Sequence, residues 1–415
     1  MGYTFSEKIL AEKSGHASLH AGEIVMVSPD FVMSHDNAAA ISKTFAKMGV
    51  ANVKHPEGVV IILDHVVPAA SAKHAENHKV IRQFVADQGI VHFHDINTGI
   101  CHQVFAEQGY ALPGTLILGS DSHTTTYGAF GAFSAGIGRT EVAAIWATGQ
   151  IWLRVPETIR IVLKGTFPTG VSAKDLALKI IGDIGADGAL YQAVEFTGPL
   201  AAAMSIAERM VLANMAAEMG AKNGYFAADA RVNAYLAGRT HSDFSPVTSD
   251  RDAQFARELT YDVSGLRPQV AKPHTVDNVS PVDDVAGTPV QQALLGTCTN
   301  GRLEDLAKAA KVLENKRVAP GVRMLVFPAS WDIYSQAMEQ GILATFIRAG
   351  AVIMNPGCGP CLGAHAGVLA DGEVCISSAN RNFKGRMGNP NAYVYLANPE
   401  VVAASAVAGS IQQAY

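Results

Sequence analysis

The chain has 415 residues, which is long for a single hydrophobic core and predicts two or three domains. Hydrophobic residues make up 48% of it and charged residues 17%, so a large interior can be buried, while the apolar runs are too short to span a membrane. The net charge of −5 and the lack of a basic cluster argue against a nucleic-acid partner.

The first fifteen residues, MGYTFSEKILAEKSG, lack the apolar core of a signal peptide. Five cysteines in a chain of this length are too few for a disulfide scaffold. We therefore expect a cytoplasmic protein whose cysteines are thiols or metal ligands.

Short apolar runs rich in valine and isoleucine recur between segments of helical pattern. Because these runs have no polar face, they are typical of strands buried on both sides in a parallel sheet covered by helices. They predict an α/β architecture that is repeated several times. The predicted strands lie at 59–64, 115–120, 159–165, 293–296, 323–327, 351–355 and 374–377.

Two of the helices between these strands have clear signals. Residues 172–185 begin with a serine that can cap a helix and stop at a glycine, and residues 204–220 carry an apolar stripe at helical spacing. The stretch from about 225 to 290 is the least regular, so we place one domain boundary near its end and another near 155–158. The predicted domains are residues 1–157, 158–285 and 286–415.

Near the end of the chain, the sequence NPGCGPCLGAH at 355–365 places Cys358 and Cys361 two residues apart among glycines and prolines. This spacing occurs in redox disulfides, in zinc sites and in iron-sulfur sites. A thioredoxin fold has its pair early, with most of the sheet still to follow, whereas Cys361 lies near the end of this chain. A redox disulfide is therefore disfavoured.

A third cysteine has a similar setting. Cys298, in LLGTCTNGR, lies just past the predicted strand at 293–296, in a turn of glycine, threonine and asparagine. Cys101 and Cys375 lie in segments typical of small buried thiols. Three thiolates suit either zinc or an iron-sulfur cubane in which the fourth iron keeps open positions and acts as a Lewis acid. Spacing alone does not separate these two alternatives.

Two other patterns have simpler explanations. HAENH at 74–78 has histidines four residues apart, but its glutamate does not follow the first histidine as a zinc-protease helix requires, so we expect an exposed amphipathic helix. Residues 128–141 are rich in glycine, yet they lack the GxGxxG order and the following acidic residue of a dinucleotide site.

Six motifs occur in chain order: DH (64–65), GICHQ (99–103), GSDSHTTTYGAFGAF (119–133), GTCTNGR (296–302), NPGCGPCLG (355–363) and SANRNFKGRMGNP (378–390). Taken together, they resemble the aconitase superfamily, in particular the large subunits of 3-isopropylmalate dehydratase, homoaconitase and dimethylmalate dehydratase. The resemblance runs from residue 7 to about residue 408. It implies three α/β/α domains around a central iron-sulfur cleft, without the swivelling fourth domain of full-length aconitases.

The resemblance implies a 4Fe-4S cluster with one labile iron, bound by Cys298, Cys358 and Cys361. It also implies a hydro-lyase that isomerises a small 2-hydroxy acid by dehydration and rehydration through an alkene. We expect 3-isopropylmalate, an intermediate of leucine biosynthesis, as the substrate; homoaconitase and 2,3-dimethylmalate dehydratase activities are the alternatives. Some aconitase relatives are iron sensors that bind RNA, an alternative that the acidic charge disfavours.

The resemblance also points to polar residues that follow predicted strands. Asp64 and His65 lie at the end of the predicted strand at 59–64, and they project at the carboxyl end, where open α/β sheets bind ligands. A carboxylate beside a histidine can hold it protonated as a general acid. The other catalytic residues that the resemblance implies around them are His102, Asp121 and His123.

Glu218 lies four residues after Asn214, on one face of the predicted helix at 204–220. By resemblance Glu218 is catalytic and approaches the open iron, whereas Asn214 is a weaker candidate and His35 has no assigned role. Two arginines are expected to hold substrate carboxylates, because the guanidinium group binds them in two-point geometry. The expected substrate-binding residues are Ser122, Asn380, Arg381 and Arg386.

Full-length aconitases carry their swivelling domain after this region, and that domain supplies a serine and a carboxylate-binding arginine. This chain stops at GSIQQAY. We therefore expect a small subunit that carries the swivelling domain, in a heterodimer or heterotetramer, and a large chain that is inactive or nearly so alone. The expected ligand is a small hydroxy acid, with no nucleic acid and no membrane as partners.

Overall fold

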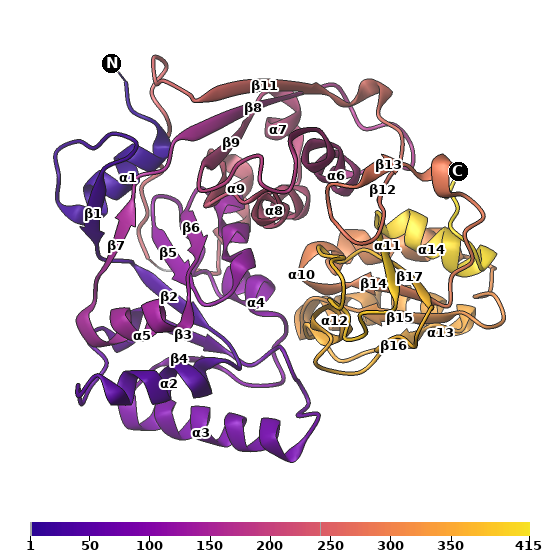
Figure 1. Ribbon diagram of the computed structural model, residues 1–415, viewed down its shortest axis with the longest axis horizontal. Coiled ribbons are helices and arrows are strands. Elements are labelled where there is room, and N and C mark those ends of the chain that lie inside the picture. Colours follow the sequence, from indigo (N-terminus) through magenta and orange to yellow (C-terminus); the bar gives the residue numbers. More distant parts are fainter. Residues whose placement is uncertain (1, 241) are drawn as a thin grey trace.

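The structure, a computed structural model, describes residues 2–240 and 242–415. Three larger sheets lie around a common centre, the first at the lower left of Figure 1, the second at the top and the third at the right. The mixed α/β architecture predicted from the apolar runs is confirmed. Among the described residues, every helix is too short or too polar to cross a bilayer.

The first sheet has five parallel strands in the order β4–β3–β2–β5–β6. Alternate residues of its buried strand β3 pack into different layers: Val59 and Ile61 face the core with α2, α3 and α5, and Val60 and Ile62 face the core with α4. The elements are β2 (Phe31–Ser34), α2 (Ala38–Lys47), β3 (Val59–Ile62), α3 (Ala72–Gln88), β4 (His92–His94), α4 (Cys101–Glu107), β5 (Leu116–Gly119), β6 (Phe133–Gly136) and α5 (Arg139–Thr148).

The second sheet has four parallel strands in the order β10–β9–β8–β11. Helix α6 begins after Ser172, which forms a capping box with Asp175, and ends at Gly185, as its sequence predicts. The elements are β8 (Thr158–Lys164), α6 (Ala173–Ile184), β9 (Ala193–Thr197), α7 (Pro199–Ala203), α8 (Ile206–Met215), β10 (Asn223–Phe226), α9 (Ala230–Leu236) and β11 (Arg257–Asp262).

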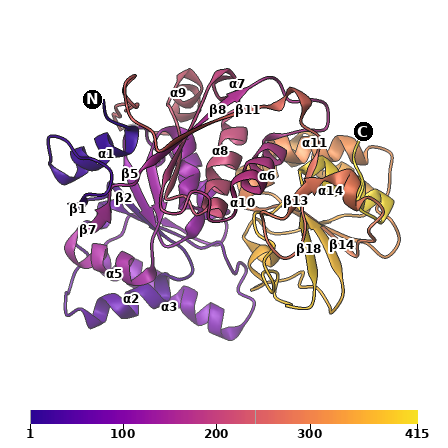
Figure 2. The ribbon, with the colours of Figure 1, turned by 45° about the horizontal axis from the view of Figure 1, so that its top comes forward.

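The third sheet has seven strands in the order β13–β12–β18–β17–β14–β15–β16, in which β12 pairs antiparallel with both of its neighbours, β13 and β18 (Figure 2). Leu294 of β14 faces the core shared with α6, and its neighbour Leu295 faces the core shared with α11, α13 and α14. The elements are β12 (Gln269–Ala271), β13 (Val279–Pro281), β14 (Gln292–Gly296), α10 (Thr297–Asn300), α11 (Leu303–Leu313), β15 (Arg323–Phe327), α12 (Trp331–Glu339), α13 (Ile342–Ala349), β16 (Val352–Ile353), β17 (Val374–Ser377), β18 (Tyr393–Leu396) and α14 (Pro399–Ala408).

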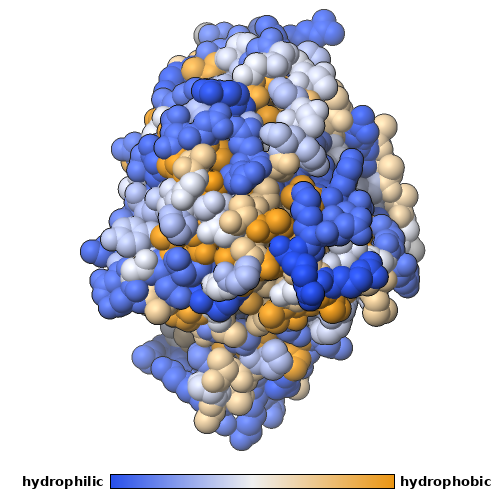
Figure 3. All heavy atoms as spheres, turned by 90° about the vertical axis from the view of Figure 1, so that its right-hand side faces the viewer, coloured by the Kyte–Doolittle hydropathy of each residue, from blue (hydrophilic) through white to orange (hydrophobic). Residues whose placement is uncertain are grey.

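A small antiparallel ribbon accompanies helix α1 (Phe5–Ser14). Its strands, β1 (Ile24–Val27) and β7 (Ile151–Arg154), alternate exposed and buried residues, and neither was predicted. On the opposite side of the molecule, around the third sheet, hydrophilic and apolar side chains are interspersed on the surface (Figure 3).

The division into three domains remains a prediction. The edge strands β12 and β13 precede residue 286, where the third domain was predicted to begin, and yet they belong to the third sheet. If domains follow sheets, the second boundary falls between Asp262 and Gln269.

Candidate active site and metal centre

Most of the predicted site residues lie where strands of the first and third sheets end, near the centre of the molecule (Figure 1), and Glu218 comes from a turn after α8. Asp64 follows β3, Asp121 follows β5, Cys298 follows β14 and Asn380 follows β17. The carboxyl ends of parallel strands are the usual place for ligands in open α/β sheets. Contacts between side chains from different sheets, described below, show that these residues form one site.

Asp121 is the carboxylate at which three histidines meet. Its side chain accepts a 2.9 Å hydrogen bond from His102 Nε2 and a 2.8 Å bond from the backbone N–H of His123, and it lies 3.5 Å from His65 Nε2. Burial disfavours the charged carboxylate, but the hydrogen bonds from His102, His123 and His65 outweigh it and hold the pKa of Asp121 well below its ordinary value. Asp121 therefore stays an anion among imidazole rings.

Asp64 and His65 form the adjacent pair. His65 Nδ1 donates to Asp64 Oδ1 at 2.5 Å, and the other carboxylate oxygen accepts the backbone N–H of Cys101, at the start of α4, at 2.7 Å. Burial alone favours neutral imidazole, but the carboxylates of Asp64 and Asp121 raise the pKa of His65 well above its ordinary value. A protonated imidazole with a fixed orientation is suited to donate a proton.

Glu218 connects this network to an arginine. Its carboxylate lies 2.7 Å from His123 Nε2 and 2.8 Å from Arg381 Nε. Burial raises the pKa of the Glu218 carboxyl, but the hydrogen bond and charge of His123, together with Arg381, lower it below its ordinary value. Helix α8 ends at Met215, so Glu218 lies in a following 3-10 turn rather than on the same α-helix as Asn214.

Cys298 lies in a tight strand-to-helix turn. Gly296 adopts a φ of 122°, and a Cβ there would come within 2.0 Å of the Phe327 carbonyl oxygen, so the turn requires glycine. The side-chain amides of Asn214 and Asn380 point N–H groups at the Cys298 sulfur, at 3.5 and 3.4 Å. Burial raises the pKa of Cys298 to about 12.

Cys358 and Cys361 lie in the loop after β16. A short 3-10 turn (Gly359–Leu362) begins just after Cys358 and contains Cys361. A hydrogen bond from the Cys358 thiol lowers the pKa of Cys361 despite its burial, and the charge of Arg386 lowers it further. One Arg386 nitrogen lies 3.8 Å from the Cys361 sulfur, whereas its buried Nε has no hydrogen-bond partner among the described residues. The Nε–H of Arg386 is therefore available to a ligand that lies beside the cysteines.

The donor set fits an iron-sulfur cluster. All three cysteines are buried and free. The Cys298 sulfur faces two amide N–H groups and the Cys361 sulfur faces a guanidinium, neighbours of the kind that stabilise cluster thiolates. Three thiolates on one zinc must lie within about 4.6 Å of one another, twice the Zn–S distance. Among the described residues, the groups gathered within 4.8 Å consist of histidine and aspartate, and the three cysteines are not among them. The three buried thiols, with their amide and guanidinium neighbours, could hold a cluster.

The two histidine and aspartate groups are His35, Asp36, Asp64 and His65, and His102, Asp121 and His123. Their carboxylates already accept hydrogen bonds from imidazoles and backbone amides. This arrangement suits proton transfer and positioning.

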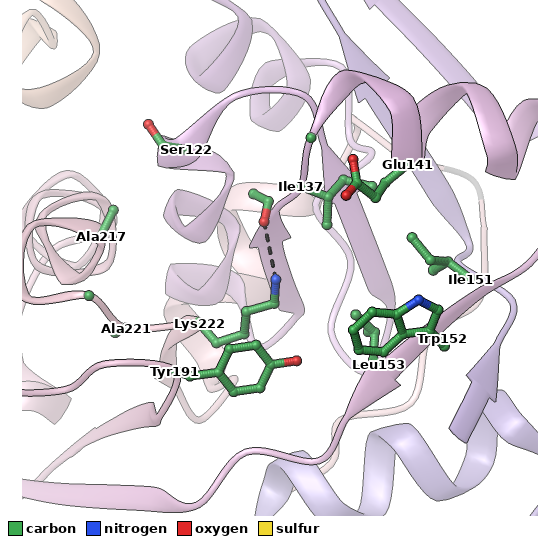
Figure 4. A pocket seen from close by; sticks show the side chains of 13 residues that line it. Ser122, Ile137, Glu141, Ile151, Trp152, Leu153, Tyr191, Ala217, Ala221 and Lys222 are labelled. Atoms are coloured by element: carbon green, nitrogen blue, oxygen red, sulfur yellow. Dashed lines mark hydrogen bonds between the residues drawn. The ribbon is translucent and has the colours of Figure 1, made fainter. Parts of the chain in front are cut away.

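Ser122 differs from the other predicted site residues because it is exposed. It lies at one end of a pocket of about 500 Å³ whose other end is formed by Trp152 and Tyr191 (Figure 4). Lys222 crosses this pocket and donates to the Gly136 carbonyl at 3.2 Å. Among the lining residues, Ser122 is the one that was predicted for the site, and it follows Asp121 directly, so the pocket lies beside the network of histidines and aspartates.

Sequence reasoning missed several polar residues that are buried or half-buried beside the site, and it gave no role to another, His35. The His35 ring stacks on His65 with centroids 3.6 Å apart, and burial lowers its pKa to about 4, so His35 is neutral. Lys174 is fully buried and donates to the carbonyls of Ser378 and Ala379, just before Asn380. The helix that carries Lys174 also contains Asp175, Lys179 and Asp183, so the local pattern gave no signal for its burial. Asp36 and His78 are the other two.

The sequence matches the Aconitase family (aconitate hydratase) over residues 7–289 and 282–409. It is 50% identical over 412 residues to 3-isopropylmalate dehydratase large subunit 1 of Methanopyrus kandleri, covering 99% of this chain and 98% of that protein. It is 51% identical over 411 residues to the probable methanogen homoaconitase large subunit of Methanothermobacter thermautotrophicus, covering 98% and 96%. The crystal structure of Thermococcus kodakaraensis aconitase X (holo-form) aligns with a TM-score of 0.49 at 12% identity, covering 86% of this chain and 84% of that one.

Proposed function

The chain belongs to the aconitase family, and from this premise we propose that it is the large subunit of a two-subunit iron-sulfur hydro-lyase acting on a small 2-hydroxy acid. The observation that carries the proposal is the meeting, in one buried site, of three free cysteines, a chain of aspartates and histidines, and two arginines. We propose 3-isopropylmalate as the substrate because curated relatives at about half identity are named for it; homoaconitase activity is the second candidate, because one relative carries that name.

Cys298, Cys358 and Cys361 would hold the 4Fe-4S cluster. When bound, such a cluster supplies a Lewis-acidic iron with open positions, which is also its most labile iron. The five free thiols of the chain suit a reducing compartment, and we expect the protein in the cytoplasm.

His65 is the general acid in this proposal. Loss of a hydroxyl from the substrate requires a proton, and the carboxylates of Asp64 and Asp121 keep the His65 ring protonated. The 2.5 Å bond to Asp64 fixes the ring, so its Nε2–H faces the centre of the site on the side of Asp121. In the reverse direction the neutral ring accepts the proton back from water.

Arg381 and Arg386 hold the substrate carboxylates. Arg381 is fixed through its Nε by Glu218, which leaves its two terminal nitrogens for a ligand. Arg386 presents an unpaired Nε beside the cysteines, and nearby thiolates raise its pKa, although burial opposes the charge. Asn380 lies between Asn214 and the Cys298 sulfur, so it positions the thiolate side of the site.

The experiment that tests this function is reconstitution with a partner. The anaerobically loaded chain is mixed with candidate small subunits, and the absorbance of the alkene product is followed with 3-isopropylmalate, homocitrate and 2,3-dimethylmalate in parallel. We expect turnover only in a mixture, with the highest kcat/KM on 3-isopropylmalate. Robust turnover by the chain alone contradicts the two-subunit arrangement, and a preference for homocitrate replaces the first substrate by the second candidate.

A further inference from the structure

We propose that Asp36 and His78 form a positioning anchor that holds the Asp64–His65 pair and the cysteine loop in register with each other. Asp36 lies just after β2, and His78 lies on α3. The geometry of the anchor is a property of the chain itself. Only the effect on turnover that we expect from it rests on the proposed function.

The Asp36 carboxylate gathers three consecutive backbone amides. It accepts hydrogen bonds from the N–H groups of Asp64 at 2.9 Å, His65 at 2.8 Å and Val66 at 3.2 Å. These amides follow the end of β3, where the strand ladder no longer supplies acceptors. One side chain therefore determines where the backbone of the acid pair lies.

His78 completes the anchor from the helix side. Its Nε2–H donates to Asp36 Oδ1 at 2.9 Å, and the ring is only 3% exposed. Residues 74–78 lie on a helix that is mostly exposed, as expected, and His78 lies on its buried side. The other histidine of the pair, His74, bonds to Ser71 at the start of the helix and makes no contact with the loop among the described hydrogen bonds.

The same loop supports the cysteine loop. The Asp64 carbonyl accepts the backbone N–H of Cys358 at 2.9 Å. Two side chains of the cysteine loop bond further along, from Asn355 to the Val67 carbonyl at 3.3 Å and from His365 to the Pro68 carbonyl at 3.1 Å. Asp36 binds the backbone N–H groups of residues 64–66, and the backbone N–H of Cys358 binds the carbonyl oxygen of Asp64. Displacement of the anchor therefore shifts the Asp64–His65 pair and the cysteine loop together.

The test compares His78→Leu, which removes the donor, with His78→Gln, whose amide N–H can replace Nε2–H. His74→Leu is the matched control from the same helix. The first measurement is hydrogen exchange of the cofactor-free chain at the amides of 64–66 and 358. We expect His78→Leu to speed exchange at both places at least about tenfold, as loss of a buried hydrogen-bonded partner predicts, with His78→Gln and His74→Leu close to the unmodified chain.

The second measurement is kcat and KM per intact cluster in the reconstituted complex. We expect His78→Leu to lower kcat roughly 10- to 100-fold, the usual effect of second-shell loss, with KM changed little and activity recovered in His78→Gln. Unchanged exchange at 64–66 and 358 in His78→Leu, or an equal effect of His74→Leu, overturns the proposal. If His78→Leu does not fold, Asp36→Asn is measured for exchange instead, with the same expected pattern.

Failure of the proposed function is distinguishable from failure of the anchor. Absence of turnover in every complex leaves the exchange pattern of the cofactor-free chain unaffected. A normal exchange pattern in an active enzyme contradicts the anchor alone.

Discussion

Replacement of Cys298, Cys358 or Cys361 by serine is expected to lower kcat of the reconstituted complex by more than about 100-fold. Changes in residues that only support a metal ligand already cost about 10- to 100-fold, and loss of a ligand itself costs more. A serine hydroxyl is a poor substitute because soft thiolates are the ligands that iron-sulfur clusters select. The bound iron and sulfide of each variant, measured anaerobically, should fall together with kcat.

Cys375→Ala is the matched control for these variants. Cys375 is also a fully buried free thiol, but it lies inside β17 and burial raises its pKa to about 12. We expect this variant to keep its iron while losing some stability through the small cavity. A serine variant that retains full iron and turnover would remove that cysteine from the ligand set.

The second large effect is expected from Asp121→Asn, which should lower kcat by roughly 10³- to 10⁴-fold at unchanged iron content. The Asp121 carboxylate accepts a hydrogen bond from His102 and lies near both His65 and His123. An asparagine would replace one of the two acceptor oxygens by an NH2 group, which donates. A comparable substitution beside a catalytic histidine costs about 10⁴-fold through the wrong tautomer. Steady-state kinetics with iron analysis of the same sample gives the measurement.

Asp95→Asn serves as its control. Asp95 pairs with Arg82 at 2.6 Å on the surface of the same sheet region, and an exposed pair contributes little to stability or to the site. We expect its kcat within about twofold of the unmodified enzyme. An Asp121→Asn variant within tenfold of the unmodified enzyme would show that the carboxylate does not organise the acid.

Parallel strands with an unbroken apolar run were predictable, because burial on both faces leaves only apolar residues in a short run. The parallel strands without such a signal were missed: β2, β4, β6, β9, β10, β11 and β18. The strands β15 (Arg323–Phe327) and β17 (Val374–Ser377) occupy the predicted ranges residue for residue. The antiparallel strands β1 and β7 were missed because they alternate exposed and buried residues over only four positions and pair across a long sequence separation. Pairing of that kind is decided by tertiary packing rather than by local pattern.

Site residues could be predicted where the sequence around a residue indicates its role. Cys298 and Cys358 each follow a strand in a glycine-containing turn, and the resemblance then assigned the aspartates and histidines. The anchor was not predictable in this way, because the role of His78 depends on Asp36, 42 residues earlier. A histidine at helical spacing shows which face it occupies, and only the packed structure shows what covers that face.

Lys174 illustrates the same limit. Its helix was placed correctly from the cap at Ser172, yet nothing in the segment shows that the ammonium is fully buried and reaches the carbonyls of Ser378 and Ala379 in another sheet. Burial lowers its pKa to about 8, although the surrounding thiols and carboxylates favour the charge. Contacts between sheets carry this information, and they are absent from any single segment.

The central claim is that three thiols hold an iron-sulfur cluster, and iron analysis of the chain tests it most directly. The chain is purified without oxygen, its iron and sulfide are measured, and an EPR spectrum is recorded after mild oxidation. We expect about four irons and four sulfides per chain. After loss of one iron, we expect the EPR signal of a three-iron form. Colourless protein free of iron and sulfide, even after reconstitution with both, would contradict it.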